Sequence, residues 1–284
     1  MNTSPFSTVQ CRNKKLNLQT PKIMGILNVT PDSFSDGGQF TSVDTALSHI
    51  EKMVNEGASV IDIGGESTRP GADPVSVKDE LERTIPVLKH AVNKFPDTLF
   101  SIDTTKYDVA NKAIEVGAHI INDVSGLENE PRFVELCRKS GCAYICMHSQ
   151  GDPKTMQNNP SYSDVIDDIY TFFGKKILEL NAGGVENILL DPGIGFGKTL
   201  EHNARLIGDL DHFSSLKYPI LIGASRKAMI GKILGNRDVN DRLIGTIAIH
   251  YHCLMKGASI IRVHDVKEAA DSIKIFNAVT AANN

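Results

Sequence analysis

Short apolar runs rich in β-branched residues alternate with longer amphipathic stretches along this chain of 284 residues. Eight runs have the length and composition of β-strands: Ile23–Val29, Val60–Ile63, Leu99–Ile102, His119–Ile121, Ala143–Met147, Ile188–Leu190, Ile220–Ile222 and Ser259–Val263. Stretches between them carry apolar residues at the spacing of one helix face, such as Leu47, Ile50 and Val54. Strand candidates that alternate with helix candidates predict βα units and a parallel sheet.

Glycine precedes five of the eight predicted strands, in most cases followed at once by alanine. The five positions are Gly57, Gly117, Gly141, Gly183 with Gly184, and Gly257. A helix that ends just before a short turn commonly places its next residue in the left-handed conformation, which glycine adopts most readily. The glycines therefore predict short turns between each helix and the strand that follows it.

The connections that follow the predicted strands are longer and richer in Gly, Pro, Asp and Ser. Short turns at one end of a parallel sheet and elaborate loops at the other are typical of a TIM barrel, which fills about 250 residues as one domain. We therefore expect an α/β fold with a single (β/α)8 TIM barrel over residues 21–284, preceded by an N-terminal extension over residues 1–20. A doubly wound open sheet is the alternative.

The formal net charge is −4, so the chain has no excess of basic residues for nucleic acid or an anionic membrane. No run reaches 18 apolar residues, the length of a membrane-spanning helix. The first twenty residues lack the apolar segment of an export signal. We expect a cytoplasmic protein with no nucleic-acid partner and no membrane partner.

Five cysteines are present, and three of them, Cys137, Cys142 and Cys146, lie close together in the sequence. Their spacings differ from C-x2-C, and no second Cys/His pair follows at zinc-finger distance. We expect buried free thiols in a reducing compartment rather than a metal site.

In a TIM barrel, catalytic residues stand where the strands end and the following loops begin. A polar or ionisable side chain stands at or shortly after the end of every predicted strand. These residues are Asn28, Glu66, Asp103, Asn122 with Asp123, His148, Asp191, Ser225 with Arg226 and Lys227, and Arg262 with His264. Acid and amide groups follow the third, fourth and sixth strands, where they can accept hydrogen bonds from N–H groups. Basic groups follow the seventh and eighth strands, where barrels commonly bind phosphate. This distribution predicts a nitrogen-rich heterocyclic ligand that carries a phosphate group.

The glycine-rich segment Asp191–Thr199 ends like a Walker A loop. Pro192 stands where that motif requires its first glycine, and Lys198 stands at the third glycine position of the Rossmann fingerprint. Both nucleotide-binding motifs are therefore excluded. The loop is expected to let its backbone approach a ligand closely.

The loops after the first two predicted strands are long, and each carries one residue suited to a ligand, Phe34 in the first and Arg69 in the second. Adjacent loops of this kind favour a lid over the site. The sequence contains no arrangement of Ser, His and Asp that suggests a catalytic triad, so no nucleophile is predicted. Ser225 lies beside Arg226 and Lys227, which indicates a contact with an anion.

Seven segments resemble, in order, the signature motifs of the dihydropteroate synthase family. They are Met24–Gly38, Gly64–Gly71, Ser101–Thr104, Ile121–Val124, Asp191–Lys198, Ser225–Lys227 and Ile261–Val266. The first two are long enough to be highly specific, and the resemblance extends from about residue 21 to the C-terminus. The segment Met147–Gln150 is similar but less clear-cut, so a role for His148 is left open.

The resemblance implies a pterin-binding TIM barrel that acts in folate biosynthesis. Such an enzyme condenses a dihydropterin methyl diphosphate with p-aminobenzoate to give dihydropteroate and diphosphate, with Mg²⁺ as cofactor. Loss of diphosphate would precede attack by the amine, so no nucleophile or strong base is needed. The resemblance also implies sulfonamide inhibitors and a homodimer.

The resemblance further implies a role for each residue that matches a motif. The pterin would be bound by Asp103, Asn122, Met147, Asp191, Lys227 and Arg262. The aminobenzoate would lie among Phe34, Thr68, Arg69, Pro70, Phe196 and Ser225. The diphosphate would meet Asn28, Arg69, Arg262 and His264, with Asn28 also a ligand of Mg²⁺. The catalytic residues would be Asp103, Lys227, Arg262 and Asp36.

Two alternatives are weighed against this interpretation. A pterin-binding methyltransferase would keep the Asp/Asn set but has no need of Arg69 or of the basic residues after the last two strands. A non-catalytic pterin-binding homologue is expected to have lost Asn28, Asp36, Arg69 or Lys227, and this chain has all four.

Overall fold

The computed structural model describes residues 7–30, 39–67, 73–151 and 155–282. Eight parallel strands form one sheet in the order β8-β7-β6-β5-β4-β3-β10-β9. They are β3 (Lys22–Asn28), β4 (Val60–Gly64), β5 (Leu99–Asp103), β6 (Ile120–Asp123), β7 (Ala143–Met147), β8 (Ile188–Asp191), β9 (Leu221–Ile222) and β10 (Ile260–Val263). A parallel bridge between Leu190 and Ile220 joins the two ends of this order. The predicted barrel is therefore confirmed, and the open doubly wound sheet is wrong.

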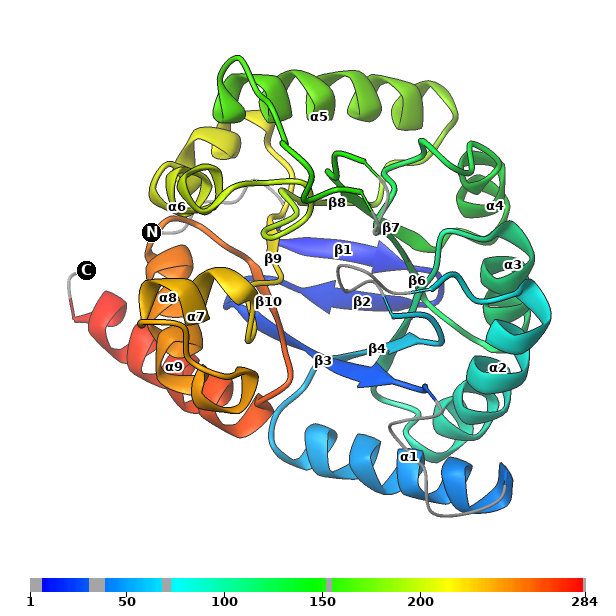
Figure 1. Cartoon of the computed structure of the whole chain (residues 1–284). Coiled ribbons are helices and arrows are strands. Elements are labelled where there is room, and N and C mark those ends of the chain that lie inside the picture. The colour runs from blue at the N-terminus through cyan, green and yellow to red at the C-terminus, as the bar shows by residue number, and fades with distance from the viewer. Residues whose placement is uncertain (1–6, 31–38, 68–72, 152–154, 283–284) are drawn as a thin grey trace.

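Helices surround the strands on the outside of the barrel (Figure 1). They are α1 (Gln39–Asn55), α2 (Val77–Lys94), α3 (Tyr107–Val116), α4 (Phe133–Ser140), α5 (Val165–Ala182), α6 (Leu200–Gly208), α7 (Ala228–Ile233), α8 (Leu243–Met255) and α9 (Val266–Ala281). Two 3-10 helices, η2 (Leu210–Leu216) and η3 (Val239–Asp241), lie in the connections that precede β9 and α8. Within the described ranges no helix is long and apolar enough to cross a membrane.

The predicted glycine turns between helices and strands are present. Gly117 follows α3 with φ of 117°, and its N–H bonds to carbonyls of the last helical turn. Gly141 ends α4 in the same left-handed region. Of the pair after α5, Gly184 rather than Gly183 takes the positive φ.

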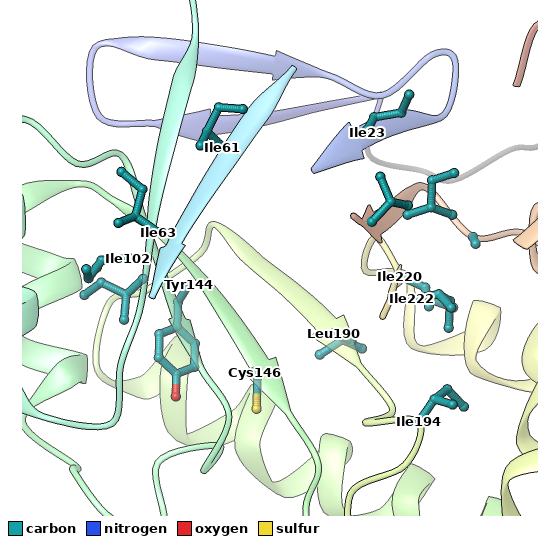
Figure 2. Close-up of a cluster of buried hydrophobic side chains, with 14 of the residues drawn as sticks. Ile23, Ile61, Ile63, Ile102, Tyr144, Cys146, Leu190, Ile194, Ile220 and Ile222 are labelled. Carbon is teal, nitrogen blue, oxygen red and sulfur yellow. The ribbon is translucent and has the colours of Figure 1, made fainter. Parts of the chain in front are cut away.

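Successive side chains of each barrel strand point alternately outward to the helices and inward to the barrel axis. The outward set is almost wholly apolar; Ile61, Ile63, Ile102, Leu190 and Ile222 are buried in one cluster (Figure 2). Burial of each such side chain contributes about 1.5–3 kcal/mol to folding. The inward set is apolar at the N-terminal end of the strands and polar at the C-terminal end, where the site lies.

The N-terminal extension includes a two-stranded antiparallel hairpin, β1 (Thr8–Cys11) and β2 (Lys14–Asn17), which the sequence analysis did not predict. Its Val9 and Leu16 are buried with the inward-facing Met24, Val60 and Leu99 at the N-terminal end of the barrel. The hairpin therefore closes the end of the barrel opposite the predicted site.

Hydrogen bonds from the hairpin turn hold it in this position. The Arg12 guanidinium donates to the carbonyls of Ile114 and Ala118, at 2.8 and 2.9 Å. The Lys14 ammonium donates to the carbonyl of Thr98 at 2.9 Å. Thr98 and Ala118 belong to turns that enter barrel strands, and Ile114 belongs to the last turn of α3, so the hairpin joins several βα units.

All five cysteines are buried free thiols, as expected. Sγ of Cys137 and Sγ of Cys142 lie 3.5 Å apart at the end of α4. Burial raises the pKa of the Cys11 thiol to about 12, so this thiol stays protonated.

Candidate active site

Polar side chains from six barrel strands converge at the C-terminal end of the barrel interior. They are Asn28 of β3, Asp62 of β4, Asp103 of β5, Asn122 of β6, Asp191 of β8 and Arg262 of β10. The strand register places Asp103 beside Gly64 and Asn122, and Met147 beside Asp191. Residues at matching register positions of neighbouring strands point to the same side. These side chains therefore face the barrel interior, where hydrogen bonds join Asp62, Asp103, Asn122 and Arg262 into a central polar layer.

Arg262 occupies the centre of this layer. Its Nε donates to Asp62 Oδ2 at 2.7 Å, and its Nη2 donates to Asp103 Oδ2 at 2.7 Å. Asn122 Nδ2 donates to the same oxygen of Asp62 at 2.9 Å. Hydrogen bonds between charged groups are the stronger ones, so the guanidinium is fixed in one orientation.

Asp62 is the functional residue that the sequence analysis missed. It lies fully buried within a strand that is otherwise apolar, and its Oδ1 has no hydrogen-bond partner in the described part of the chain. A carboxylate inside a run of buried apolar residues is costly unless it is paired. The charged residue within an apolar run was the sequence signal that could have identified Asp62. In the structure the charge of Asp62 is paired with that of Arg262.

Besides Asp62 Oδ1, acceptor atoms of Asp103, Asp191 and Asn122 remain without a protein partner in the described ranges. Asp103 uses only Oδ2, for Arg262. Asp191 uses only Oδ1, which accepts from the Gly193 N–H at 2.7 Å. Because Asn122 donates to Asp62, its Oδ1 is the oxygen that stays available. Asp103 Oδ1, Asp191 Oδ2 and Asn122 Oδ1 can therefore accept hydrogen bonds from a ligand.

Burial and neighbouring charges have opposing effects on the two carboxyl groups. Burial raises the pKa of Asp103 to about 7, while Arg262 lowers it and Asp62 raises it further. Burial also raises the pKa of Asp191, against which the Gly193 N–H and the cations Lys227 and Arg262 act. In both groups burial outweighs the neighbouring positive charge, so each carboxylate binds a proton more readily than a free aspartate does.

The β8–α6 loop places Phe196 next to Lys227. The Lys227 Nζ lies 3.9 Å from the centre of the Phe196 ring, a cation–π contact. A side chain in place of Gly223 would put its Cβ 3.7 Å from Asp191 Oδ2 and 4.0 Å from the Arg262 side chain. Glycine at that position therefore keeps space open between the acid and the guanidinium.

Ser225 and His264 form a pair after β9 and β10. Ser225 Oγ lies 3.0 Å from His264 Nδ1 and accepts from the His264 backbone N–H at 3.2 Å. The nearby Asp265 carboxylate is instead bound at both oxygens by the Arg226 guanidinium. No Ser-His-Asp triad forms among these residues, and Arg226 is directed to α9 rather than to the central layer.

Three other polar residues at strand ends have structural roles. Asp123 faces the helices, where it accepts from the Tyr144 hydroxyl at 2.6 Å and from the Ser125 and Leu127 N–H groups. Glu66 accepts from the Lys106 ammonium at 2.5 Å. His148 lies buried 3.0 Å from the Lys198 ammonium. Position after a strand was therefore not enough to identify a site residue.

The structure brings together the predicted Asn28, Asp103, Asn122, Asp191 and Arg262. Met147, Lys227, Phe196, Ser225 and His264 belong to the strands and loops around them. Five further predicted residues, Phe34, Asp36, Thr68, Arg69 and Pro70, lie outside the described residues. The predicted lid formed by the first two loops falls largely in the same segments.

Comparison with known proteins identifies the family. The model of the pterin binding enzyme family matches residues 24–264. The dihydropteroate synthase of Haemophilus influenzae is 47% identical over 272 residues, which cover 95% of this chain and 98% of that protein. The chain belongs to the dihydropteroate synthase family.

Solved structures of the family share this fold. The Yersinia pestis dihydropteroate synthase with a sulfonamide drug complex matches with a TM-score of 0.90 and 45% identity, over 96% of this chain and 99% of that one. The Xanthomonas albilineans enzyme with 4-aminobenzoic acid has a TM-score of 0.90 at 38% identity, over 97% and 98%. A complex of the same enzyme with 7,8-dihydropteroate has a TM-score of 0.87 at 36% identity, over 96% and 99%.

Membership over nearly the whole chain determines the class of activity. The chain is a transferase of folate biosynthesis, a dihydropteroate synthase. The two alternatives, a pterin-binding methyltransferase and a non-catalytic homologue, are therefore not supported. The Haemophilus influenzae relative, 47% identical to this chain, is a dihydropteroate synthase.

Proposed function

We propose that this chain condenses (7,8-dihydropterin-6-yl)methyl diphosphate with p-aminobenzoate at the C-terminal end of the barrel. The observation that carries the proposal is the set of three available acceptors, Asp103 Oδ1, Asp191 Oδ2 and Asn122 Oδ1, around the Arg262 guanidinium. A pterin presents an amino group and ring N–H groups along one edge, so it needs acceptors of this kind.

The pterin would bind with its N–H edge toward these acceptors. Met147 is almost fully buried beside Asp191 and offers an apolar thioether for the ring to pack on. Lys227 would add a donor for the pterin carbonyl. Arg262 has its Nη1 without a partner in the described ranges, and its planar group can stack on the ring while it faces the diphosphate.

The residues around Asn28 fit a magnesium ion with bound diphosphate. Mg²⁺ prefers oxygen ligands and usually takes one or two from the protein and the rest from water and phosphate. A Cβ added at Gly64 would lie 3.7 Å from Asn28 Oδ1 and 3.5 Å from Asp103 Cβ, so glycine keeps space open beside the amide oxygen. Asn28 would hold the ion, which when bound neutralises charge on the leaving diphosphate.

Binding of the diphosphate by this chain would use Arg262 and His264, with Arg69 from the second loop. The Ser225–His264 contact orients the imidazole after β10. Cationic groups stabilise the negative charge that develops as the diphosphate leaves. Asp103 and Asp191 would stabilise the positive charge that develops on the pterin, since both lie at its proposed ring edge.

The aminobenzoate would bind against Phe196 and Ser225, with Phe34, Thr68, Arg69 and Pro70 on its other side. The contact between Phe196 and Lys227 places an aromatic ring next to the proposed pterin pocket. Bond cleavage before amine attack fits this site, because Asp103 and Asp191 would stabilise the positive charge that cleavage leaves on the pterin. Asp36 would assist from the first loop. Sulfonamide inhibitors would compete for the same position.

A homodimer through α7, α8 and α9 completes the proposal. Ile244 and Met255 of α8 are 79% and 56% exposed, and Ile275 of α9 is 60% exposed. Ile233 at the end of α7 adds to this apolar surface. Exposed apolar side chains gathered on neighbouring helices mark contact surfaces.

A cytoplasmic location is supported by five buried free thiols.

Release of diphosphate from the dihydropterin substrate tests the function. We expect release and formation of dihydropteroate with p-aminobenzoate and Mg²⁺ present, and loss of both activities with a chelator. Slow diphosphate release without p-aminobenzoate would support cleavage before attack. The absence of dihydropteroate under all these conditions would contradict the proposed function.

A further inference from the structure

We propose that Lys198 is a positioning residue that joins the loops after β7 and β8 and thereby sets the affinity for p-aminobenzoate through Phe196. The inference rests on the proposed function, because it concerns the binding of the second substrate. Lys198 itself is buried, with its ammonium bonded to the Phe196 carbonyl, and is not expected to touch the substrate.

Lys198 uses all of its hydrogen-bond donors to connect the two loops. Its Nζ lies 3.0 Å from His148 Nδ1, 3.2 Å from the His148 carbonyl and 2.9 Å from the Phe196 carbonyl. An ammonium has three N–H groups and no acceptor, so these contacts account for every donor. When Lys198 is protonated, His148 accepts at Nδ1 and carries its proton on Nε2.

Burial of the Lys198 ammonium costs folding free energy, which an apolar side chain at the same position would not cost. Its side chain is 2% exposed, and no carboxylate lies within ion-pair distance of its Nζ in the described ranges. Burial lowers the pKa of Lys198 to about 7, with Lys227 acting in the same direction and Asp191 against it. A buried charge without a counter-ion destabilises the fold unless its hydrogen bonds are needed. A methionine would fill the same space without that penalty.

The join between the two loops is closely packed. Gly193 has φ of +68°, and a Cβ there would lie 2.0 Å from the His148 carbonyl oxygen. The His148 ring packs edge-on against Phe172 at 4.9 Å between ring centres. His148 therefore offers Lys198 a fixed pair of acceptors, and Lys198 transmits that position to the Phe196 carbonyl.

Other contacts hold the remainder of the same loop. Tyr162 donates from its hydroxyl to the Gly197 carbonyl at 2.8 Å, and Gln157 Nε2 donates to the Gly195 carbonyl at 2.9 Å. Asn203 Oδ1 accepts from the Gly195 N–H at 2.6 Å. Loss of the Lys198 bonds is therefore expected to displace Phe196 while the loop as a whole stays folded.

The test compares Lys198→Met with Lys176→Met. Lys176 on α5 is a control for the loss of a largely buried ammonium, because its side chain is 13% exposed, it forms ion pairs with Glu128 and Glu179, and in the described part of the chain it touches the His148 region only through the Phe172 ring, whose centre lies 5.9 Å from its Nζ. We expect Lys198→Met to raise KM for p-aminobenzoate roughly tenfold, since small displacements of a positioning group have effects of this size. KM for the dihydropterin diphosphate should change much less. Lys176→Met should leave both KM values unchanged.

His148→Phe tests the same connection between the two loops by removing the ring nitrogen that Lys198 contacts. The Lys198 ammonium stays intact, and the ring contact with Phe172 is kept. We expect the same selective rise in the aminobenzoate KM, and a double variant with Lys198→Met no worse than the more affected single variant, because both changes break one connection. If Lys198→Met does not fold, His148→Phe alone decides.

Equal changes in the two KM values, or an unchanged aminobenzoate KM, would overturn the inference. A wild-type protein without turnover would instead contradict the proposed function, so the two failures are distinguishable.

Discussion

Arg262 Nη2 donates to Asp103 Oδ2 at 2.7 Å, although the two residues are 159 positions apart in the chain. Closure of the barrel makes this contact possible, because β10, the last strand, pairs with β3, the first, and Arg262 can then reach across the barrel interior to Asp103 on β5. Asp103 is bound on one oxygen and available on the other, and Arg262 is fixed between two carboxylates. One ion pair thus joins the proposed pterin pocket to the proposed diphosphate pocket.

Replacement of Arg262 by lysine is expected to impair turnover nearly as much as replacement by alanine. Lysine keeps the charge but lacks the planar group that bonds Asp62 and Asp103 together and can stack on a ring. Steady-state kinetics of both variants provide the measurement. Near-normal kcat/KM in Arg262→Lys would show that a positive charge alone is sufficient.

Pterin binding is expected to strengthen as the pH rises from 6 to 8. Burial raises the pKa of Asp103 to about 7, so the carboxylate that accepts hydrogen bonds predominates only above that value. Below it the group is protonated and loses both the acceptor and the charge opposite Arg262. Calorimetry with a dihydropterin at several pH values provides the measurement.

Asp103→Asn is the control for this pH dependence, because an amide does not titrate. We expect weak binding by this variant that is nearly independent of pH. An unchanged pH dependence in Asp103→Asn would assign the titration to another group, such as Lys198, whose pKa also lies at about 7.

The barrel and most of its central polar layer could be predicted from the sequence for physical reasons. A strand buried under helices must be apolar, so the eight strands appear as short runs, each with a polar side chain at or shortly after its C-terminal end. Asn28, Asp103, Asn122, Asp191 and Arg262 are all found in this way.

Orientation of side chains could not be predicted from the same rule. Asn122 and Asp123 are neighbours, but one points into the barrel and the other to Tyr144 under the helices. Asp62 is the penultimate residue of its run, as Asn28 and Arg262 are of theirs, and it was missed because Glu66 after the same run was taken instead. The hairpin was missed because its two strands have only four residues each, too few for an alternating pattern to stand out.

Asp191→Asn is expected to weaken pterin binding about ten- to hundredfold, since loss of one charged hydrogen bond in a buried site costs roughly 1.5–3 kcal/mol. Asp191 Oδ1 already accepts from the Gly193 N–H, so the amide would turn its N–H₂ toward the ligand, where an acceptor is needed. Calorimetry with a dihydropterin measures the effect. Unchanged affinity would rule out this residue as a pterin ligand.

Leu16→Ala is expected to reduce stability without a change in KM. Leu16 is 3% exposed between the hairpin and the inward-facing apolar residues, and truncation of a buried leucine typically costs about 2–5 kcal/mol. The proposed site lies at the opposite end of the barrel. Thermal unfolding should show a lower Tm, and kinetics at low temperature should match those of the wild type. A large change in KM would indicate that the hairpin also affects the site.

p-Aminobenzoate is expected to bind the free enzyme poorly and to bind much better when pterin, diphosphate and Mg²⁺ are present. The described part of its proposed pocket consists of Phe196 and Ser225 beside Lys227, which offers one aromatic face and few other contacts. The remaining contacts are proposed to come from Phe34 and Pro70 in the first two loops, next to the diphosphate position. Bound diphosphate would attract the cationic second loop and exclude water that could otherwise react with the pterin cation. Equilibrium dialysis with radiolabelled p-aminobenzoate, with and without the other three components, measures the difference. Phe34→Ala should weaken aminobenzoate binding more than pterin binding, whereas equal aminobenzoate affinity for the free and the loaded enzyme would contradict this order of assembly.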